Sequence, residues 1–157
     1  MANFKNAFDQ GLKAAADAAA VIAEINSVFE EMNTEISAAS DGKVNINRET
    51  RTDGASMAAI LGMGIFASKP PAQEIKYITY IVAKNPLAEN NNKADIGQVN
   101  IHKKGYPCEV KFGGDKYICE DKKGLERVLS LMLTDPEVGK ELSRLIRLPI
   151  IATQDPE

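Results

Sequence analysis

The first quarter of the chain carries one apolar stripe with helical spacing, and no other feature constrains the fold as strongly. Apolar residues recur there at steps of three and four. The stripe consists of Phe4, Phe8, Leu12, Ala15, Ala18, Ile22, Ile25, Phe29, Met32 and Ile36. This period predicts one long amphipathic helix. We expect it to end at Asp41-Gly42, because glycine commonly terminates a helix.

The predicted helix is longer than the body to which it belongs. Residues 4–36 span about 50 Å at a rise of 1.5 Å per residue. A compact domain of 157 residues is only about 39 Å across. Either the helix bends around the body, or part of its apolar stripe is left over for a second copy of the chain or for another protein.

The segments that follow the helix predict strands, loops and one ambiguous run. Residues 44–47 alternate like a half-buried strand, and the polar residues 48–54 indicate a loop. The apolar residues 55–67 fit a buried strand or a short helix, and periodicity does not decide between them. Residues 75–83 are rich in β-branched and aromatic side chains on both alternating sets, which predicts a central strand covered on both faces. Residues 85–95 form a long polar loop.

Residues 96–120 predict a strand meander with a definite register. Gly113-Gly114 has the composition of a two-residue hairpin turn, and a second turn is expected at Lys104-Gly105. Counting outward from these turns gives the pairs Lys111–Lys116, Val110–Tyr117, Cys108–Cys119, Ile101–Cys108 and Val99–Val110. This register keeps one face apolar, whereas a slip of one residue would mix charges into it. The opposite, polar face carries Gln98, Asn100, His102, Glu109, Lys111, Lys116 and Glu120.

Two short helices are expected near the C-terminus. Asp121 is placed to cap a helix that ends near Thr134, and Asp135-Pro136 begins another. Together the elements predict an α+β fold with a long N-terminal helix, an antiparallel or mixed sheet of about five or six strands, and two C-terminal helices packed on one face. We expect residues 1–151 to form a single domain and residues 152–157 to be a flexible tail.

Composition disfavours several classes of partner. The chain has 19 basic and 22 acidic residues, a net charge of −3, and basic residues spread along its length. Nucleic acid is therefore an unfavoured partner, because phosphate binding needs a concentrated positive footprint. No apolar run reaches the roughly 20 residues of a membrane span, and the N-terminus lacks the pattern of a signal peptide. Two cysteines without an export signal predict free thiols and a cytoplasmic location.

Few residues suggest chemistry. His102 is the single histidine, which excludes a two-histidine metal site, and the predicted register puts Cys108 on the opposite face of the sheet. A nucleophilic cysteine would need the imidazole on its own side. We expect no metal and no cofactor.

One alternative is a metal-dependent nuclease. Glu109 and Lys111 share a strand, and Asp95 lies upstream. Two carboxylates that hold magnesium and a lysine that stabilises developing charge form such sites. The same E-x-K string also begins at Glu74 and Glu120, however, and the basic groove that a nuclease needs is missing.

The hypothesis that fits these observations best is a non-enzymatic protein that acts by binding another protein, as an inhibitor, immunity or assembly factor, or by binding itself as a homodimer. The apolar contact is expected from the helix, through Ile22, Ile25, Phe29 and Met32. The polar specificity is expected from the sheet face, through Asn100, His102, Glu109 and Lys111.

Overall fold

A computed structural model describes residues 2–52 and 76–151 of the chain. The elements in chain order are α1 (Phe4–Ala39), β1 (Asn45–Thr52), β2 (Tyr77–Lys84), β3 (Lys93–His102), β4 (Gly105–Phe112), β5 (Asp115–Cys119), α3 (Lys122–Thr134) and α4 (Pro136–Ile146). The predicted α+β arrangement of a long helix, a sheet and two C-terminal helices is confirmed. The ambiguous run 55–67 and the predicted tail 152–157 lie outside the described residues.

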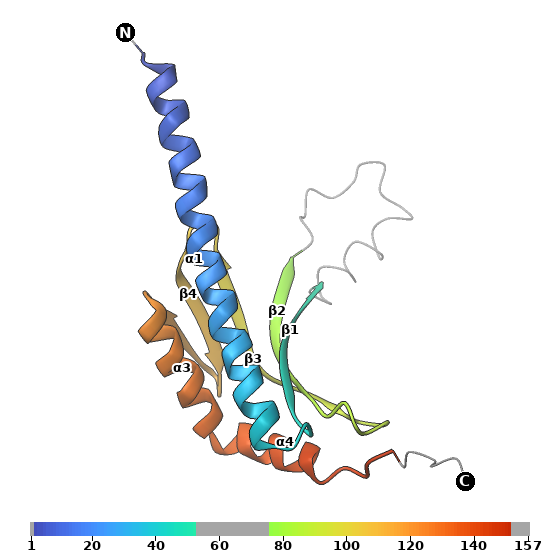
Figure 1. The fold of residues 1–157 in the computed structure, drawn as a ribbon. Helices are drawn as coiled ribbons and strands as arrows, with labels where there is room; N and C mark the ends of the chain where they lie inside the picture. Colours follow the sequence, from blue (N-terminus) through green and yellow to red (C-terminus); the bar gives the residue numbers. More distant parts are fainter. Residues whose placement is uncertain (1, 53–75, 152–157) are drawn as a thin grey trace, which may run out of the picture.

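The five strands form one sheet in the order β1-β2-β3-β4-β5, and every neighbouring pair is antiparallel. All three described helices pack on the same face (Figure 1), with α1 against β1 and β4, α3 against β4 and β5, and α4 against β3. We call this the helix face. The other side is named the outer face, and no described helix covers it.

Helix α1 is capped at its start and projects beyond the sheet. The side chain of Asn3 accepts a hydrogen bond from the backbone N–H of Asn6, and the helix ends before Asp41 and Gly42, which both have positive φ. Its C-terminal half is core, whereas the N-terminal half extends past the sheet (Figure 1). Of the two alternatives for a helix longer than the body, the structure therefore shows an overhang.

The prediction of a loop over residues 48–54 was wrong for residues 48–52, which continue strand β1. In this part of β1, polar side chains make the packing contacts that apolar side chains make in most strands. The Arg48 guanidinium lies 4.3 Å from the ring centre of Phe29 and donates a hydrogen bond to Asn26. The hydroxyl groups of Thr50 and Thr79 are 2.9 Å apart across the strand pair. A polar edge strand lacks the hydrophobic period on which the prediction depended.

Strand β2 lies between two other strands, as predicted for a central strand. Only part of its length is buried on both faces. Ile81, Val82 and Ala83 are buried, whereas Tyr77 at the start of the strand is 66% exposed. The buried part pairs with both β1 and β3, and the exposed start pairs with β1 alone.

The register of the β3–β4–β5 meander is confirmed for every predicted pair. One turn differs, because His102 pairs with Gly105 and the turn residues are Lys103 and Lys104. An irregularity after Ile101 restores the predicted register. Gly105 has φ of +94°, and a Cβ atom at this position would collide with Val21 of α1. A side chain is therefore excluded where the β3–β4 turn meets the long helix.

Both C-terminal helices begin at the predicted caps. The Asp121 side chain accepts from the N–H of Gly124 at 2.7 Å, and the Asp135 side chain accepts from the N–H of Glu137 at 2.9 Å. Pro136 occupies the first turn of α4, where its missing N–H costs no hydrogen bond.

The predicted polar loop begins at Asn85, which is fully buried. Its amide Nδ2 donates to the carbonyl of Leu145 at 2.7 Å, and its Oδ1 accepts from the N–H of Leu87 at 2.9 Å. The loop is shorter than expected, because β3 already starts at Lys93. Asn85 thus fastens the β2–β3 connection to the end of α4.

Candidate functional site

The outer face of the sheet carries two rows of side chains that cross several strands. The strand registers and the alternation of the strands define these rows. The first row contains Glu49, Tyr80, Gln98, Lys111 and Lys116. The second contains Arg51, Ile78, Asn100, Glu109 and Ile118. The structure therefore brings together three of the predicted sheet residues, Asn100, Glu109 and Lys111.

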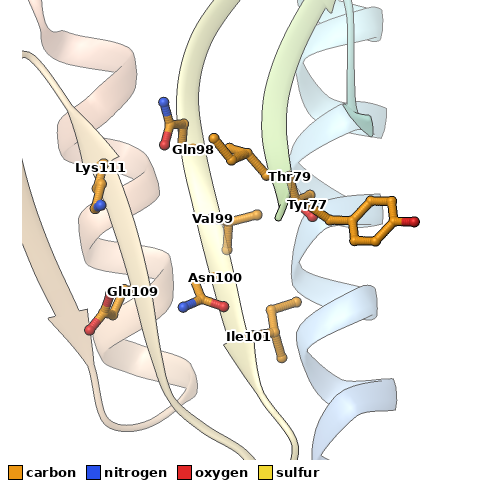
Figure 2. A pocket seen from close by; sticks show the side chains of 9 residues that line it. Tyr77, Thr79, Gln98, Val99, Asn100, Ile101, Glu109 and Lys111 are labelled. Atoms are coloured by element: carbon orange, nitrogen blue, oxygen red, sulfur yellow. The ribbon is translucent and has the colours of Figure 1, made fainter. Parts of the chain in front are cut away.

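A hollow of about 340 Å³ opens where the sheet splits. β2 and β3 pair only as far as Thr79 and Val99. Beyond this point β2 stays with β1 and β3 stays with β4, so the two halves of the sheet part (Figure 1). Side chains from three strands line the hollow (Figure 2): Tyr77, Ile78, Thr79, Gln98, Val99, Asn100, Ile101, Glu109 and Lys111.

The hollow has a polar side and an apolar side. Glu109 and Lys111 project from β4, and β3 with Asn100 lies between them and Tyr77 of β2 (Figure 2). The Glu109 carboxylate lies 3.6 Å from the ammonium of Lys116. Lys111 forms no ion pair with any residue in the described ranges. The site therefore offers a free ammonium, an amide and an apolar wall.

A network of charged side chains lies beside the hollow on the outer face. Arg51 donates to both carboxylate oxygens of Asp95, at 2.7 and 2.9 Å, and to Glu49 at 3.1 Å. Lys93 lies 3.0 Å from Glu49, and the Arg51 guanidinium lies 4.5 Å from the ring centre of Tyr80. Hydrogen bonds from Lys93 and Arg51 lower the pKa of Glu49, and Asp95 and Glu49 raise the pKa of Arg51. The network is an ordered patch of both charge signs.

The structure does not assemble the three residues of the nuclease alternative. Glu109 pairs with Asn100 and Asp95 pairs with Val82, so the two carboxylates lie more than about 10 Å apart along the strand direction. Bonds from magnesium or calcium to oxygen are only about 2.0–2.6 Å long, and Asp95 is already engaged by Arg51. Lys111 and Glu109 both line the hollow. Lys111 and Asp95 both line a second hollow, of about 620 Å³. Within the described part of the chain, no group of three acidic, histidine or cysteine side chains is placed to hold a metal.

His102 is not among the residues that line the hollow. It is exposed at the end of β3, where its Nδ1 accepts from the N–H of Lys104 at 3.3 Å. Cys108 and Cys119 are opposite each other on the helix face, fully buried and unbridged. The neighbouring Cys108 thiol and burial both raise the pKa of Cys119, so this side chain stays a neutral thiol. His102 is exposed whereas both thiols are buried, so the structure does not bring the imidazole and a thiol together.

The predicted helix residues occupy two environments. Ile25, Phe29 and Met32 belong to the hydrophobic core of the chain itself, and Ile22 is half-buried. The accessible apolar residues of α1 are Phe4, Phe8 and Leu12, which are 81%, 64% and 58% exposed. These three were in the predicted stripe but not among the predicted binding residues. The length of the helix indicated an overhang. It did not show which end of the helix the body covers.

No family model, curated protein or solved structure matches the chain. Among the described residues, no helix is long and apolar enough to cross a membrane.

Proposed function

We propose that this protein is a cytoplasmic, non-enzymatic factor that binds another protein, of the inhibitor, immunity or assembly type. The outer face of the sheet supplies the recognition surface, and the hollow between β2 and β3 is its centre. The observation that carries this proposal is that hollow, where an apolar wall meets Asn100, Glu109 and Lys111. Two free, buried thiols support the compartment, because thiols persist where glutathione keeps them reduced.

A protein suits this surface better than a small molecule. Pockets for small ligands enclose most of the ligand surface, whereas this hollow is open along the sheet. Ile118, in the same outer-face row as Glu109, is 59% exposed, and Tyr77, which alternates to the helix face at the split of the sheet, is 66% exposed. Protein interfaces combine such aromatic and aliphatic side chains with a polar rim, and one anchoring side chain of a partner fits into a central pocket.

The charges of the hollow indicate what the partner presents. Lys111 forms no ion pair with any described residue, so a carboxylate or a row of carbonyl oxygens on the partner would give its ammonium a partner. Glu109 is already paired with Lys116 and requires no further cation. A partner loop that carries an acidic side chain beside an apolar anchor matches the hollow.

Photo-crosslinking in cells tests the proposal. A photoreactive phenylalanine replaces Lys111 in one variant, Asn100 in a second, and Lys123 in a control, because Lys123 is an exposed lysine on α3. We expect one discrete protein adduct from the two outer-face positions and none from Lys123. Adducts from neither outer-face position, or the same adduct from all three, would rule out recognition through this face.

A charge reversal supplies the second readout. Lys111→Glu is expected to abolish the adduct formed at Asn100, because the partner's acceptor then meets a negative charge. Lys123→Glu is the matched control and should leave that adduct unchanged. Equal adduct yields in the two variants would contradict a role for Lys111.

A further inference from the structure

The N-terminal part of α1 presents an apolar stripe that no described residue covers. Residues 4–17 are all exposed, and they extend beyond the sheet for about 21 Å (Figure 1). We call these residues the overhang. Phe4, Phe8 and Leu12 are 81%, 64% and 58% exposed there. Large apolar side chains placed together on one exposed face indicate an interaction surface.

The stripe of the overhang continues the seam by which α1 packs in the core. Two series with a spacing of seven residues run along the helix: Phe8, Ala15, Ile22, Phe29, Ile36 and Phe4, Gly11, Ala18, Ile25, Met32. The C-terminal members of both series pack against the sheet and α3. With respect to the described residues, the seam therefore lacks a partner only along the overhang.

The sizes of the side chains define the direction of that partner. Phe4 and Phe8 lie at the N-terminal end of the overhang, Ala15 lies near its other end, and Ala19 follows one helical turn after Ala15 on the same side of α1. An antiparallel copy of the same helix sets each Phe8 against an Ala15 and each Phe4 against an Ala19. Large side chains then face small ones, which is the arrangement that fills a core without voids. A parallel copy would crowd phenylalanine against phenylalanine and leave a gap between alanines.

The length of the overhang fits the same arrangement. Pairing Phe8 with Ala15 places Phe4 of the second copy at Ala19. Two residues further on, Val21 packs against Gly105 of the β3–β4 turn, and the body begins. The second helix thus ends where the body starts, and each overhang is covered along its whole length.

Area and charge also favour a second copy. At roughly 200 Å² for each aromatic side chain, the exposed fractions of Phe4 and Phe8 amount to about 290 Å² per chain and about 580 Å² per pair, to which Leu12, 58% exposed, adds. Gly11 and Ala15 on the same side add to this area, and a specific interface buries roughly 1,200 Å² or more. The overhang contains two lysines and two aspartates, so two copies do not repel each other.

We propose that the protein is a homodimer in which the two overhangs pair antiparallel, with Phe8 of each chain against Ala15 of the other. This deepens the proposed function by naming the occupant of the helix surface, and it does not require the outer face. The dimer presents two outer faces, one at each end of the paired helices, and so binds two copies of the partner.

Sedimentation equilibrium of the purified full chain at micromolar concentrations tests the dimer. We expect the mass of a dimer for the wild type. Phe8→Asp should weaken dimerisation about 100-fold or more, because a charge replaces a buried aromatic ring. Gln10→Asp adds the same charge on the opposite side of the overhang and should leave the dimer intact. A monomeric wild type, or equal dimerisation of the two variants, would overturn the proposal.

A double-mutant cycle tests the direction of the pairing. Phe8→Ala and Ala15→Phe should each weaken the dimer, and the chain that carries both should recover it, because large again faces small. Residues that touch across an interface give such non-additive effects, whereas separated residues do not. Additive losses would exclude the antiparallel register. Both positions are exposed in the single chain, so circular dichroism should show unchanged folding.

The two proposals fail separately. Phe8→Asp leaves the outer face in place, so the adduct at Lys111 should persist when the dimer is lost. If the dimer forms and no adduct appears, the outer-face function is wrong and the helix pairing stands. If the adduct appears with a monomeric wild type, the reverse holds.

Discussion

Replacement of Asn85 by alanine tests how the C-terminal helix is fastened to the sheet. Asn85 is fully buried, and its side chain joins the carbonyl of Leu145 in α4 to the N–H of Leu87 in the β2–β3 loop. Asn85→Ala removes both hydrogen bonds at once and leaves a small cavity. The neighbouring backbone groups then lose partners inside the protein.

The expected cost follows from these contacts. Each lost hydrogen bond contributes about 1 kcal/mol. The Leu145 carbonyl keeps a bond from the N–H of Leu148, and Leu87 lies in the loop with 39% of its surface exposed. The penalty for unpaired groups is therefore modest, and the cavity adds to it. We expect the free energy of unfolding to fall by about 2–3 kcal/mol, which lowers the melting temperature by about 5–10 °C.

Urea denaturation and a thermal melt measure the change. Asn90→Ala is the control, because Asn90 lies exposed in the same loop and should change the unfolding free energy by less than about 0.5 kcal/mol. Hydrogen exchange should become faster at the Leu87 amide in Asn85→Ala alone. If the two variants are equally stable, Asn85 does not fasten α4 and the reasoning fails.

Three further predictions concern the turn, the charged network and the thiols. Gly105→Ala should destabilise the protein by about 1–3 kcal/mol in urea, because it forces a side chain into α1 at positive φ; an unchanged midpoint would contradict that contact. Glu49 has a lowered pKa because of Lys93 and Arg51, so the wild type should exceed Glu49→Gln in stability above the ordinary pKa of 4.5 and lose this advantage as the pH falls through the lowered value. A gap that persists in acid would exclude the pair as its cause. Cys108 and Cys119 are buried and should react with a thiol reagent only at the rate of unfolding, so fast labelling of the folded chain would refute their burial.

Local patterns in the sequence predicted a large part of the fold. The three- and four-residue spacing of the stripe predicted α1, and the caps at Asp121 and Asp135 marked the starts of α3 and α4. The glycine pair at 113–114 specified the register of the meander. These features depend on residues close together in the chain, where backbone geometry and alternation leave few choices.

Contacts between distant segments produced the features that sequence patterns missed. Residues 48–52 form a strand because they pair with β2 and because Arg48 packs on Phe29 of α1. Asn85 became core because the end of α4 supplied a carbonyl group. These contacts join segments that are far apart in the sequence, so no local hydrophobic period predicted the longer strand β1 or the burial of Asn85.

The candidate surfaces divide in the same way. The sequence alone determined that Asn100, Glu109 and Lys111 share a polar face and that α1 exceeds its body, because strand alternation and helix rise are local properties. Only the tertiary structure decided that the sheet splits between β2 and β3 to form the hollow, and that the covered half of α1 is the one with Ile25 and Phe29. Which part of an apolar stripe becomes core depends on where the rest of the chain packs, and that packing is a sum over contacts far apart in sequence.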